Sequence, residues 1–330
     1  MDYRSGPEFS QADIRDVRDF LRGRRLKKYF LPPERLHVVN DGREHFLRIS
    51  NGKTGEYPIR GSFLFKLLKW YSFPSRQIDR LSIDTVTSVL NDYLLAIPGG
   101  EVNVTLEDGE AVSLTSNRYS ELSDIDVLDC AERVGVACVS RNDFFMRVYC
   151  DTRYEVQPVP GDVCGIGYNV LNSETGFRAL SVHLFVRRHV CSNGAVIGLT
   201  AEEGRRVHYG HPDMELRTFL EEQMRAGEQL QEEVGRLLEK SAHIPSQPLI
   251  GHVSARLRPI IGKKRSDDVI ENLGAEATVY DLANAITSMA QTLDLRRRLL
   301  AESFGGELLV PAAGLAAPAR EEIENQLIGA

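Results

Sequence analysis

The chain has few of the features that mark secreted, membrane or metal-binding proteins. Its five cysteines are an odd number, widely spaced and without a C-x-x-C pair, so they indicate neither a disulfide framework nor a redox motif. No apolar run approaches the ~18 residues that a membrane span needs, and the chain opens on the charged stretch MDYRSGPEF. We therefore expect a reduced, cytoplasmic protein that does not enter a membrane.

An excess of positive charge is also lacking. The 330 residues contain 40 Lys and Arg against 47 Asp and Glu, a formal net charge of -7, so the surface as a whole does not attract polyanions and any nucleic-acid site must be local. Hydrophobic residues at 42% and charged residues at 26% are typical of globular proteins. At about 150 residues per domain, the length predicts about two domains.

Hydrophobic periodicity predicts an α+β fold with a central antiparallel sheet of three or more strands packed against long helices. Three segments alternate strictly between an apolar and a less apolar face, as half-buried strands do: 144–150, 164–170 and 180–186. All three share one apolar face, and the face of the third strand that is less apolar carries Phe185 and Arg187.

The loop between the second and third of these strands suits a short turn with Gly176 in the left-handed conformation. Pairing Ser173 with Phe177 places Val170 opposite Leu180 and keeps the apolar residues together. A slip of one residue would place apolar side chains opposite polar ones, which is why we expect this register.

The other elements follow from periodicity, capping residues and turn signals. We expect hairpins at 36–49 and 102–114, short strands at 195–199 and 205–208, and helices at 9–29, 63–71, 82–97, 123–134, 214–239 and 278–300. The pair Gly305-Gly306 is expected to end the last helix. The predicted organisation is an N-terminal α+β unit (1–100), a larger domain (101–309) and a flexible tail with a short helix (310–330).

No local pattern predicts a cofactor or a metal ion. The stretch Gly165–Val170 lacks the third glycine of a dinucleotide fingerprint and alternates like a strand. The histidine and cysteine spacing matches no standard metal site; the residues considered are His183, His189, Cys191, His208 and His211. The carboxylate pairs Asp124-x-Asp126 and Glu202-Glu203 are of the kind that metal-dependent nucleases use, but a helix start and a turn are the favoured interpretation.

Two basic clusters are the better functional signal. Residues 15–28 contain seven Lys and Arg against two Asp, and residues 251–266 contain five Lys and Arg and no acid. Such clusters either contact phosphates or pair with acidic helices of the same chain, and both interpretations stay open. Phe185 could stack on a base or lie under a helix. The candidate phosphate contacts are Arg187, Arg188, Arg256, Arg258, Lys263, Lys264 and Arg265.

Three longer stretches carry a recognisable pattern. The central one, NVLNSETGFRALSVHLFVRRHVCSNGAVIG, has an N-S-x-x-G turn before a strand and then R-x-V-C-x-N-G. The flanking ones are LTSNRYSELSDIDVLDCAERVG and TVYDLANAITSMAQTLDLRRRLLAESFGGELL, the second with a D-x-x-N-A-x-T helix. Over about residues 102–309 the chain resembles a large phage/plasmid-like family known only as a domain of unknown function. The resemblance implies a mobile-element origin and assigns no reaction.

The order of three antiparallel strands followed by a long helix is also similar to that of single-strand annealing proteins, whose rings hold DNA in a basic groove. We therefore expect a non-catalytic DNA-binding protein of a phage or plasmid, acting on single strands in replication or recombination, as a homo-oligomer. One alternative is a protein-interaction factor that docks partners on its long acidic helix and its C-terminal helix. Another is a metal-dependent hydrolase.

Overall fold

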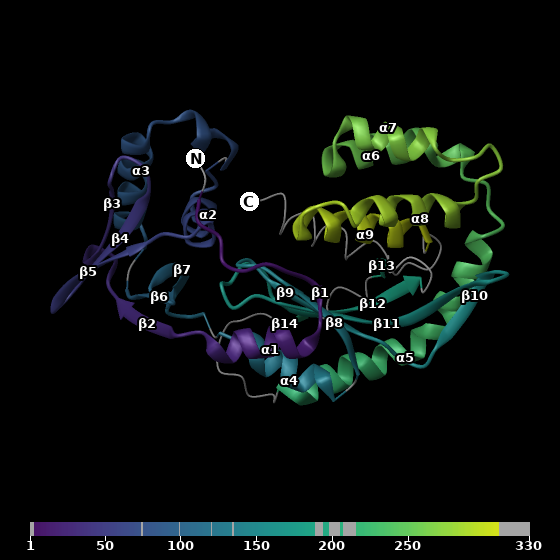
Figure 1. The fold of residues 1–330 in the computed structure, drawn as a ribbon, viewed down its shortest axis with the longest axis horizontal. Helices are drawn as coiled ribbons and strands as arrows, with labels where there is room; N and C mark the ends of the chain where they lie inside the picture. Colours follow the sequence, from purple (N-terminus) through teal and green to yellow (C-terminus); the bar gives the residue numbers. More distant parts are fainter. Residues whose placement is uncertain are drawn as a thin grey trace.

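The computed structural model has an α+β fold with antiparallel sheets (Figure 1). It describes residues 3–73, 75–98, 100–119, 121–133, 135–188, 194–197, 205–206 and 216–309. The order of the main sheet is β1 (Phe9–Ala12), β8 (Val136–Arg141), β9 (Met146–Cys150), β11 (Asp162–Asn172), β12 (Leu180–Arg188) and β13 (Gly194–Ile197). Two further strands extend it, β10 (Glu155–Val159) on β11 and β14 (Arg205–Arg206) on β12.

Helices cover both faces of this sheet (Figure 1). The apolar face packs against α1 (Ile14–Gly23), α4 (Asp124–Glu132) and α5 (Leu216–Ser241). The opposite face is covered by α9 (Leu295–Leu309), which forms a pair with α8 (Val279–Ala290). A second pair lies outside them and consists of α6 (Ile250–Ile261) and α7 (Lys263–Glu271), joined to α5 through the 3-10 turn Gln247–Leu249.

The three alternating strands are confirmed, and their register differs from the expected one by two residues. Val170 pairs with Val182, not with Leu180. The loop is longer than a three-residue turn because it is held from outside: Thr175 Oγ1 donates to the carbonyl of Asp143 at 2.9 Å. A shift of two preserves the side-chain faces, so the apolar pattern could not detect it. The left-handed conformation of Gly176, at a φ of 76°, is confirmed.

In the structure we use the name N-terminal unit for residues 26–116, which form two small sheets and two helices. One sheet has the order β2 (Leu26–Leu31), β6 (Val102–Glu107), β7 (Glu110–Ser116), and the other β3 (Leu36–Asn40), β4 (His45–Asn51), β5 (Lys53–Pro58). Both expected hairpins are thereby confirmed. The helices are α2 (Gly61–Trp70) and α3 (Ile83–Leu95), and the 3-10 segments are Pro33–Arg35 and Ser75–Arg80.

The expected helix at 9–29 is wrong at both ends. Only its middle is helical, as α1, and the cap is Asp13, whose side chain accepts from the backbone N–H of Arg15. Residues before it pair with β8 as β1, and residues after it pair with β6 as β2. The apolar spacing reflected the helical turns in the middle, and strand pairing with distant residues overrides helix propensity on either side.

The C-terminal helix is also divided. Its predicted capping box is confirmed at Thr278 and Asp281, but the helix ends at Ala290 and α9 begins at Leu295. The glycine pair does not end α9 and lies inside it. A Cβ on Gly305 would approach Thr287 Cγ2 to 2.7 Å, so the glycine allows α8 and α9 to pack closely.

Two large hydrophobic cores occupy the two parts of the molecule. The core of the N-terminal unit spans residues from Leu31 to Leu114 and so includes the hairpin β6–β7. The core of the main sheet includes Val17 and Leu21 of α1. The domain boundaries at 100 and 309 stay a prediction. Among the described residues no helix is long and apolar enough to cross a membrane.

Candidate functional site

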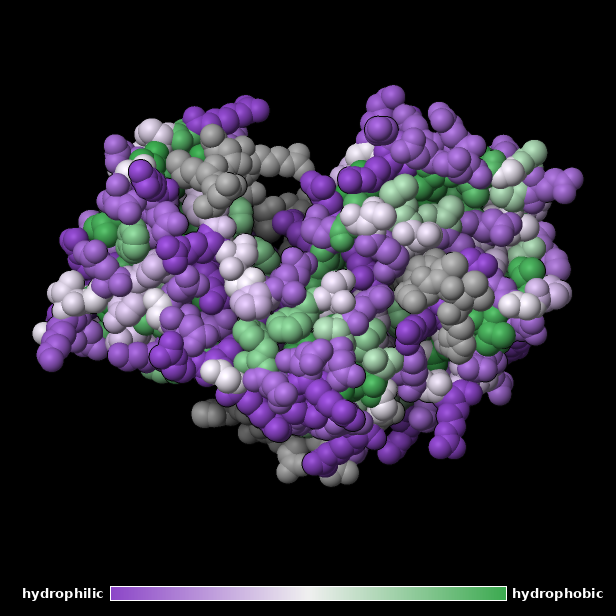
Figure 2. All heavy atoms as spheres, in the orientation of Figure 1, coloured by the Kyte–Doolittle hydropathy of each residue, from purple (hydrophilic) through white to green (hydrophobic). Residues whose placement is uncertain are grey.

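The exposed turn between α6 and α7 gathers four of the seven candidate cations. Gly262 has a φ of 88°, which ends α6 and turns the chain into α7, so residues on both sides of it come together. Figure 2 shows hydrophilic residues over the outer surface of these two helices. We call this surface the α6–α7 turn; its cations are Arg258, Lys263, Lys264 and Arg265.

One carboxylate of α7 contacts two of these cations. Asp267 lies 3.1 Å from Arg258 Nη2 and 3.1 Å from Lys263 Nζ. Hydrogen bonds from Lys263 and Arg258 hold the pKa of Asp267 below its usual range. Lys264 and Arg265 are exposed and form no ion pair with the described residues. The N-terminus of α7 has no side-chain cap, so the positive end of its dipole adds to the potential of the turn.

The other three candidate cations lie elsewhere and are held by carboxylates. Arg187 contacts Asp151 at 2.9 Å, and Arg188 contacts Asp162 at 2.6 Å. Arg256 contacts Glu307 at 2.7 Å, and its guanidinium group stacks over the ring of Phe304. The structure therefore assembles one exposed cationic surface from the seven residues, and not a groove that includes the end of β12.

Phe185 is not available to a base. Its side chain is 2% exposed, in a cluster that includes Tyr149 and the α9 residues Leu295 and Leu299. The prediction that it stacks on a base is wrong, because α9 covers the face of the sheet on which Phe185 lies. Its second interpretation, packing beneath a helix, is what the structure has.

The first basic cluster, at residues 15–28, is largely paired within the chain. Arg18 contacts Asp129 and Glu132 of the acidic helix α4, at 3.1 and 2.5 Å. Lys28 contacts Glu121 at 3.0 Å. Pairing with acidic segments therefore accounts for this cluster.

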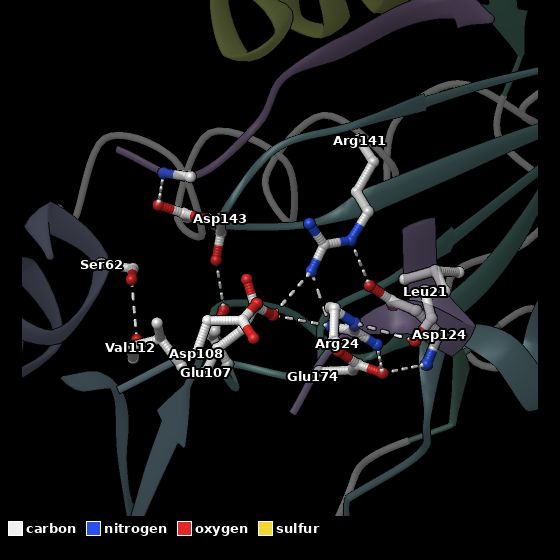
Figure 3. Close-up of polar contacts among 12 residues, drawn as sticks. Leu21, Arg24, Ser62, Glu107, Asp108, Val112, Asp124, Arg141, Asp143 and Glu174 are labelled. Carbon is white, nitrogen blue, oxygen red and sulfur yellow. Dashed lines mark hydrogen bonds and ion pairs between the residues drawn. The ribbon is translucent and has the colours of Figure 1, made fainter. Parts of the chain in front are cut away.

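A buried ionic cluster, which the sequence analysis missed, lies where the N-terminal unit meets the main sheet (Figure 3). We call it the ionic junction. Its seven side chains come from six separate segments of the chain and are at most 10% exposed. They are Arg24, Arg60, Glu107, Asp124, Arg141, Asp143 and Glu174.

Within the ionic junction each arginine bridges separate elements. Arg24, just after α1, contacts Glu107 of β6 at 2.9 Å and Glu174 of the β11–β12 loop at 2.7 Å. Arg60, before α2, contacts the same Glu107 at 2.7 Å. Arg141 of β8 donates to Asp124 at 3.1 Å. Because the contacts link both hydrophobic cores, the cluster fixes the N-terminal unit on the sheet.

In the ionic junction three arginines meet four carboxyl groups, so the cluster is neutral when one of the carboxyl groups is protonated. Burial alone would lower the pKa of Arg24, but hydrogen bonding and charge attraction by Glu174 outweigh it and raise that pKa. Burial, and then the neighbouring charge of Glu174, raise the pKa of Asp124 to about 7. A cavity of about 20 Å³ lined by Arg60 and Arg141 has room for about one water molecule.

This arrangement accounts for Asp124 of the carboxylate pair Asp124-x-Asp126, whereas Asp126 is exposed. Asp124 is 2% exposed and accepts hydrogen bonds from Arg141 and Asn172, so it serves the junction. Glu202 and Glu203 lie outside the described residues, as do His189, Cys191, His208 and His211. Within the described part of the chain no group of three or more His, Cys, Asp or Glu is arranged to hold a metal ion.

Lys66 of α2 contacts the same β11–β12 loop. Its Nζ donates to the carbonyl oxygen of Gly176, and the amine lies 5.3 Å from the centre of the Phe177 ring. Burial, with a smaller contribution from the charge of Lys69, lowers the pKa of Lys66 to about 7. This contact is a second link between the N-terminal unit and the main sheet.

Comparisons of the chain with protein-family models, with curated proteins and with solved structures find no match. The resemblance to the phage/plasmid-like family stays a prediction.

Proposed function

We propose that this protein is a non-catalytic nucleic-acid-binding protein that contacts the phosphates of single-stranded DNA through the α6–α7 turn. The observation that carries the proposal is the exposure of four cations at one turn, in a segment, 251–266, that contains no Asp or Glu. The chain as a whole has a net charge of -7, so this local excess is not a consequence of overall composition.

The physical basis is the release of counterions. Each Lys or Arg that neutralises a phosphate releases a condensed cation, which favours binding at low salt and weakens it at high salt. Lys264 and Arg265 are exposed and form no ion pair with described residues, so a phosphate need not displace a carboxylate to reach them. Arg187, Arg188 and Arg256 would each have to leave a carboxylate, and we do not include them in the primary contact surface.

The preference for single strands and the place in replication or recombination rest on the order of the elements. Strands β9, β11 and β12 precede the long helix α5, with strands β10, β13 and β14 between them, and this order is similar to that of single-strand annealing proteins. We extend the proposal to a homo-oligomer on the same ground. The proposed cytoplasmic location rests on the cysteine spacing, and the proposed phage or plasmid origin rests on the motif resemblance.

The protein-interaction alternative has less support. Val234 of α5 and Leu282 of α8 are both fully buried in the core of the main sheet. The apolar faces of these two helices, which would have docked a partner, therefore pack against the protein itself.

The proposal is tested by fluorescence anisotropy of labelled single-stranded and double-stranded oligonucleotides at ~50 mM salt, where electrostatic binding is strong. The variant Lys263→Glu/Lys264→Glu/Arg265→Glu is expected to lose most of the affinity. The matched control reverses three exposed cations away from the turn, Arg15→Glu/Arg43→Glu/Lys53→Glu, which changes the net charge equally. Equal losses in the two variants would contradict a local site, and absence of binding by the unmodified protein would contradict the proposal altogether.

A further inference from the structure

The face of the main sheet beneath α9 holds a second buried charged group, separate from the ionic junction. Arg147 of β9 is 0% exposed, and its Nε donates to Asn169 Oδ1 of β11 at 2.8 Å. Its guanidinium carbon lies 4.4 Å from the ring centre of Tyr149 and 5.3 Å from that of Phe185. The cation is thereby fixed between two aromatic rings.

The partner of Arg147 comes from α9 and is shared. Glu302, also 0% exposed, forms an ion pair with Arg147 Nη1. The same carboxylate accepts from Arg298 Nε at 2.9 Å, one helical turn away. Two guanidinium groups therefore meet one carboxylate, and the trio carries a net charge of +1 in a buried place. Burying such a net charge is unfavourable unless a counter-charge neutralises it.

The cluster also has more hydrogen-bond donors than acceptors. Two acceptors at this place form no hydrogen bond: Glu302 Oε2, which ion-pairs with Arg147 Nη1, and His183 Nδ1. Four buried donors also have no partner in the described structure: Arg147 Nη2, Arg298 Nη2, Asn169 Nδ2 and Tyr149 OH. Three of these atoms can only donate, and the phenol can donate. Buried donors are nearly always paired, so the cluster is short of an acceptor.

The neighbouring titratable groups do not supply the missing negative charge. Burial raises the pKa of Tyr149 to about 12, so the phenol stays neutral. His183, on the same face of the sheet, has its pKa lowered to about 3 by burial and by nearby arginines, and is also neutral. Cys138 pairs with Tyr149 across the strands and is half-buried, which places the solvent-facing side of the cluster at β8.

We propose that this cluster is an anion site that binds one small inorganic anion, such as chloride, between the guanidinium groups of Arg147 and Arg298. The anion accepts hydrogen bonds from the two free Nη2 atoms and from Tyr149 OH or Asn169 Nδ2, and it neutralises the trio. The site lies on the sheet under α9 and is independent of the phosphate contacts proposed for the α6–α7 turn.

Thermal unfolding of the full chain tests the site without any assay of nucleic-acid binding. Chloride is compared with gluconate, an anion too large for the site, at constant ionic strength. We expect chloride to raise Tm by about 5 °C at ~100 times its Kd, because a ligand that binds the folded state alone stabilises it. Arg298→Met removes the excess charge and should abolish the difference between the two salts. Arg297→Met, one residue along α9 with a side chain that is 56% exposed, should retain it.

Crystals of the unmodified protein grown in bromide locate the anion directly. This test does not depend on whether Arg298→Met folds. An anomalous peak within hydrogen-bond reach of both Nη2 atoms supports the site. A water molecule or a carboxylate of the chain itself at that place overturns it. A chloride-specific rise in Tm that persists in Arg298→Met also overturns it.

Discussion

Arg24 and Glu174 are 150 residues apart in the sequence and form a two-pronged ion pair, with Arg24 Nη1 and Nη2 at 2.7 and 3.1 Å from the two carboxylate oxygens. The arginine follows α1 and the glutamate belongs to the β11–β12 loop. Their side chains are 2% and 10% exposed. Because the contact is buried and bidentate, it fixes the segment between α1 and β2, where the N-terminal unit begins, on the main sheet more firmly than a surface pair would.

Replacing Arg24 by Met should destabilise the fold strongly. The change leaves Glu174 and Glu107 buried with one cation fewer, and removal of one partner from a buried ion pair typically costs about 3–5 kcal/mol. The matched control is Arg25→Met, because Arg25 is 84% exposed and contacts Asp108 at the surface. Urea denaturation measures the unfolding free energy of both variants. Similar midpoints for the two variants would contradict a structural function of the ionic junction.

Asp124 should make stability depend on pH between about 4 and 7. Its pKa is about 7 in the folded protein and near 3.8 when unfolded, so the folded state binds the additional proton over that interval. The stabilisation from this group is therefore present below pH 4 and is lost as the pH rises to about 7. The difference in unfolding free energy between the unmodified protein and Asp124→Asn should decrease from pH 4 to 7 and level off above. A difference that is constant, or that increases, would show that the carboxyl group titrates normally.

Lys66 should make stability increase with pH, in contrast to Asp124, and over a higher pH range. Burial lowers its pKa to about 7 from 10.5, so between these values the unfolded state binds the additional proton. Stability contributed by this group therefore rises with pH from 7 to about 10. Denaturation of the unmodified protein and of Lys66→Met across this range measures the effect. The prediction fails if the two proteins keep the same difference in stability throughout.

Gly305 should be intolerant of a side chain. The added methyl group of Gly305→Ala would lie 2.7 Å from Thr287 Cγ2 and would separate α8 from α9, at a cost of about 1–3 kcal/mol. Gly251→Ala in α6 is the control, because nothing lies within 4 Å of its Cβ position. That variant should be neutral or more stable by up to ~1 kcal/mol. The urea midpoints of Gly305→Ala and Gly251→Ala are compared. A Gly305→Ala variant as stable as the unmodified protein would contradict the close packing of the two helices.

Elements set by local patterns could be predicted from the sequence. The alternation in β11 and β12 and the capping box at Thr278 are confirmed because neighbouring residues determine them. The division of residues 9–29 into strand, helix and strand was missed, since it depends on pairing with β8 and β6. Local sequence does not contain those partners.

The same distinction between local and long-range features applies to the candidate site. The cations of the α6–α7 turn lie close together in the sequence, in the segment 251–266, so their grouping could be predicted. The ionic junction could not be, because its ion pairs join residues such as Arg60 and Glu107 that look like ordinary surface charges in the sequence. Alternation places Arg147 and Tyr149 on one face of β9, but that α9 covers this face follows only from the tertiary structure.

The most direct test of the central claim is the salt dependence of single-strand binding by the unmodified protein and by Lys263→Glu/Lys264→Glu/Arg265→Glu. For single strands the slope of log K against log salt is about -0.7 for each neutralised phosphate. If these three residues contact phosphates, the slope of the variant should be smaller in magnitude by about 2. The same slope in both proteins would show that the α6–α7 turn does not contact the nucleic acid.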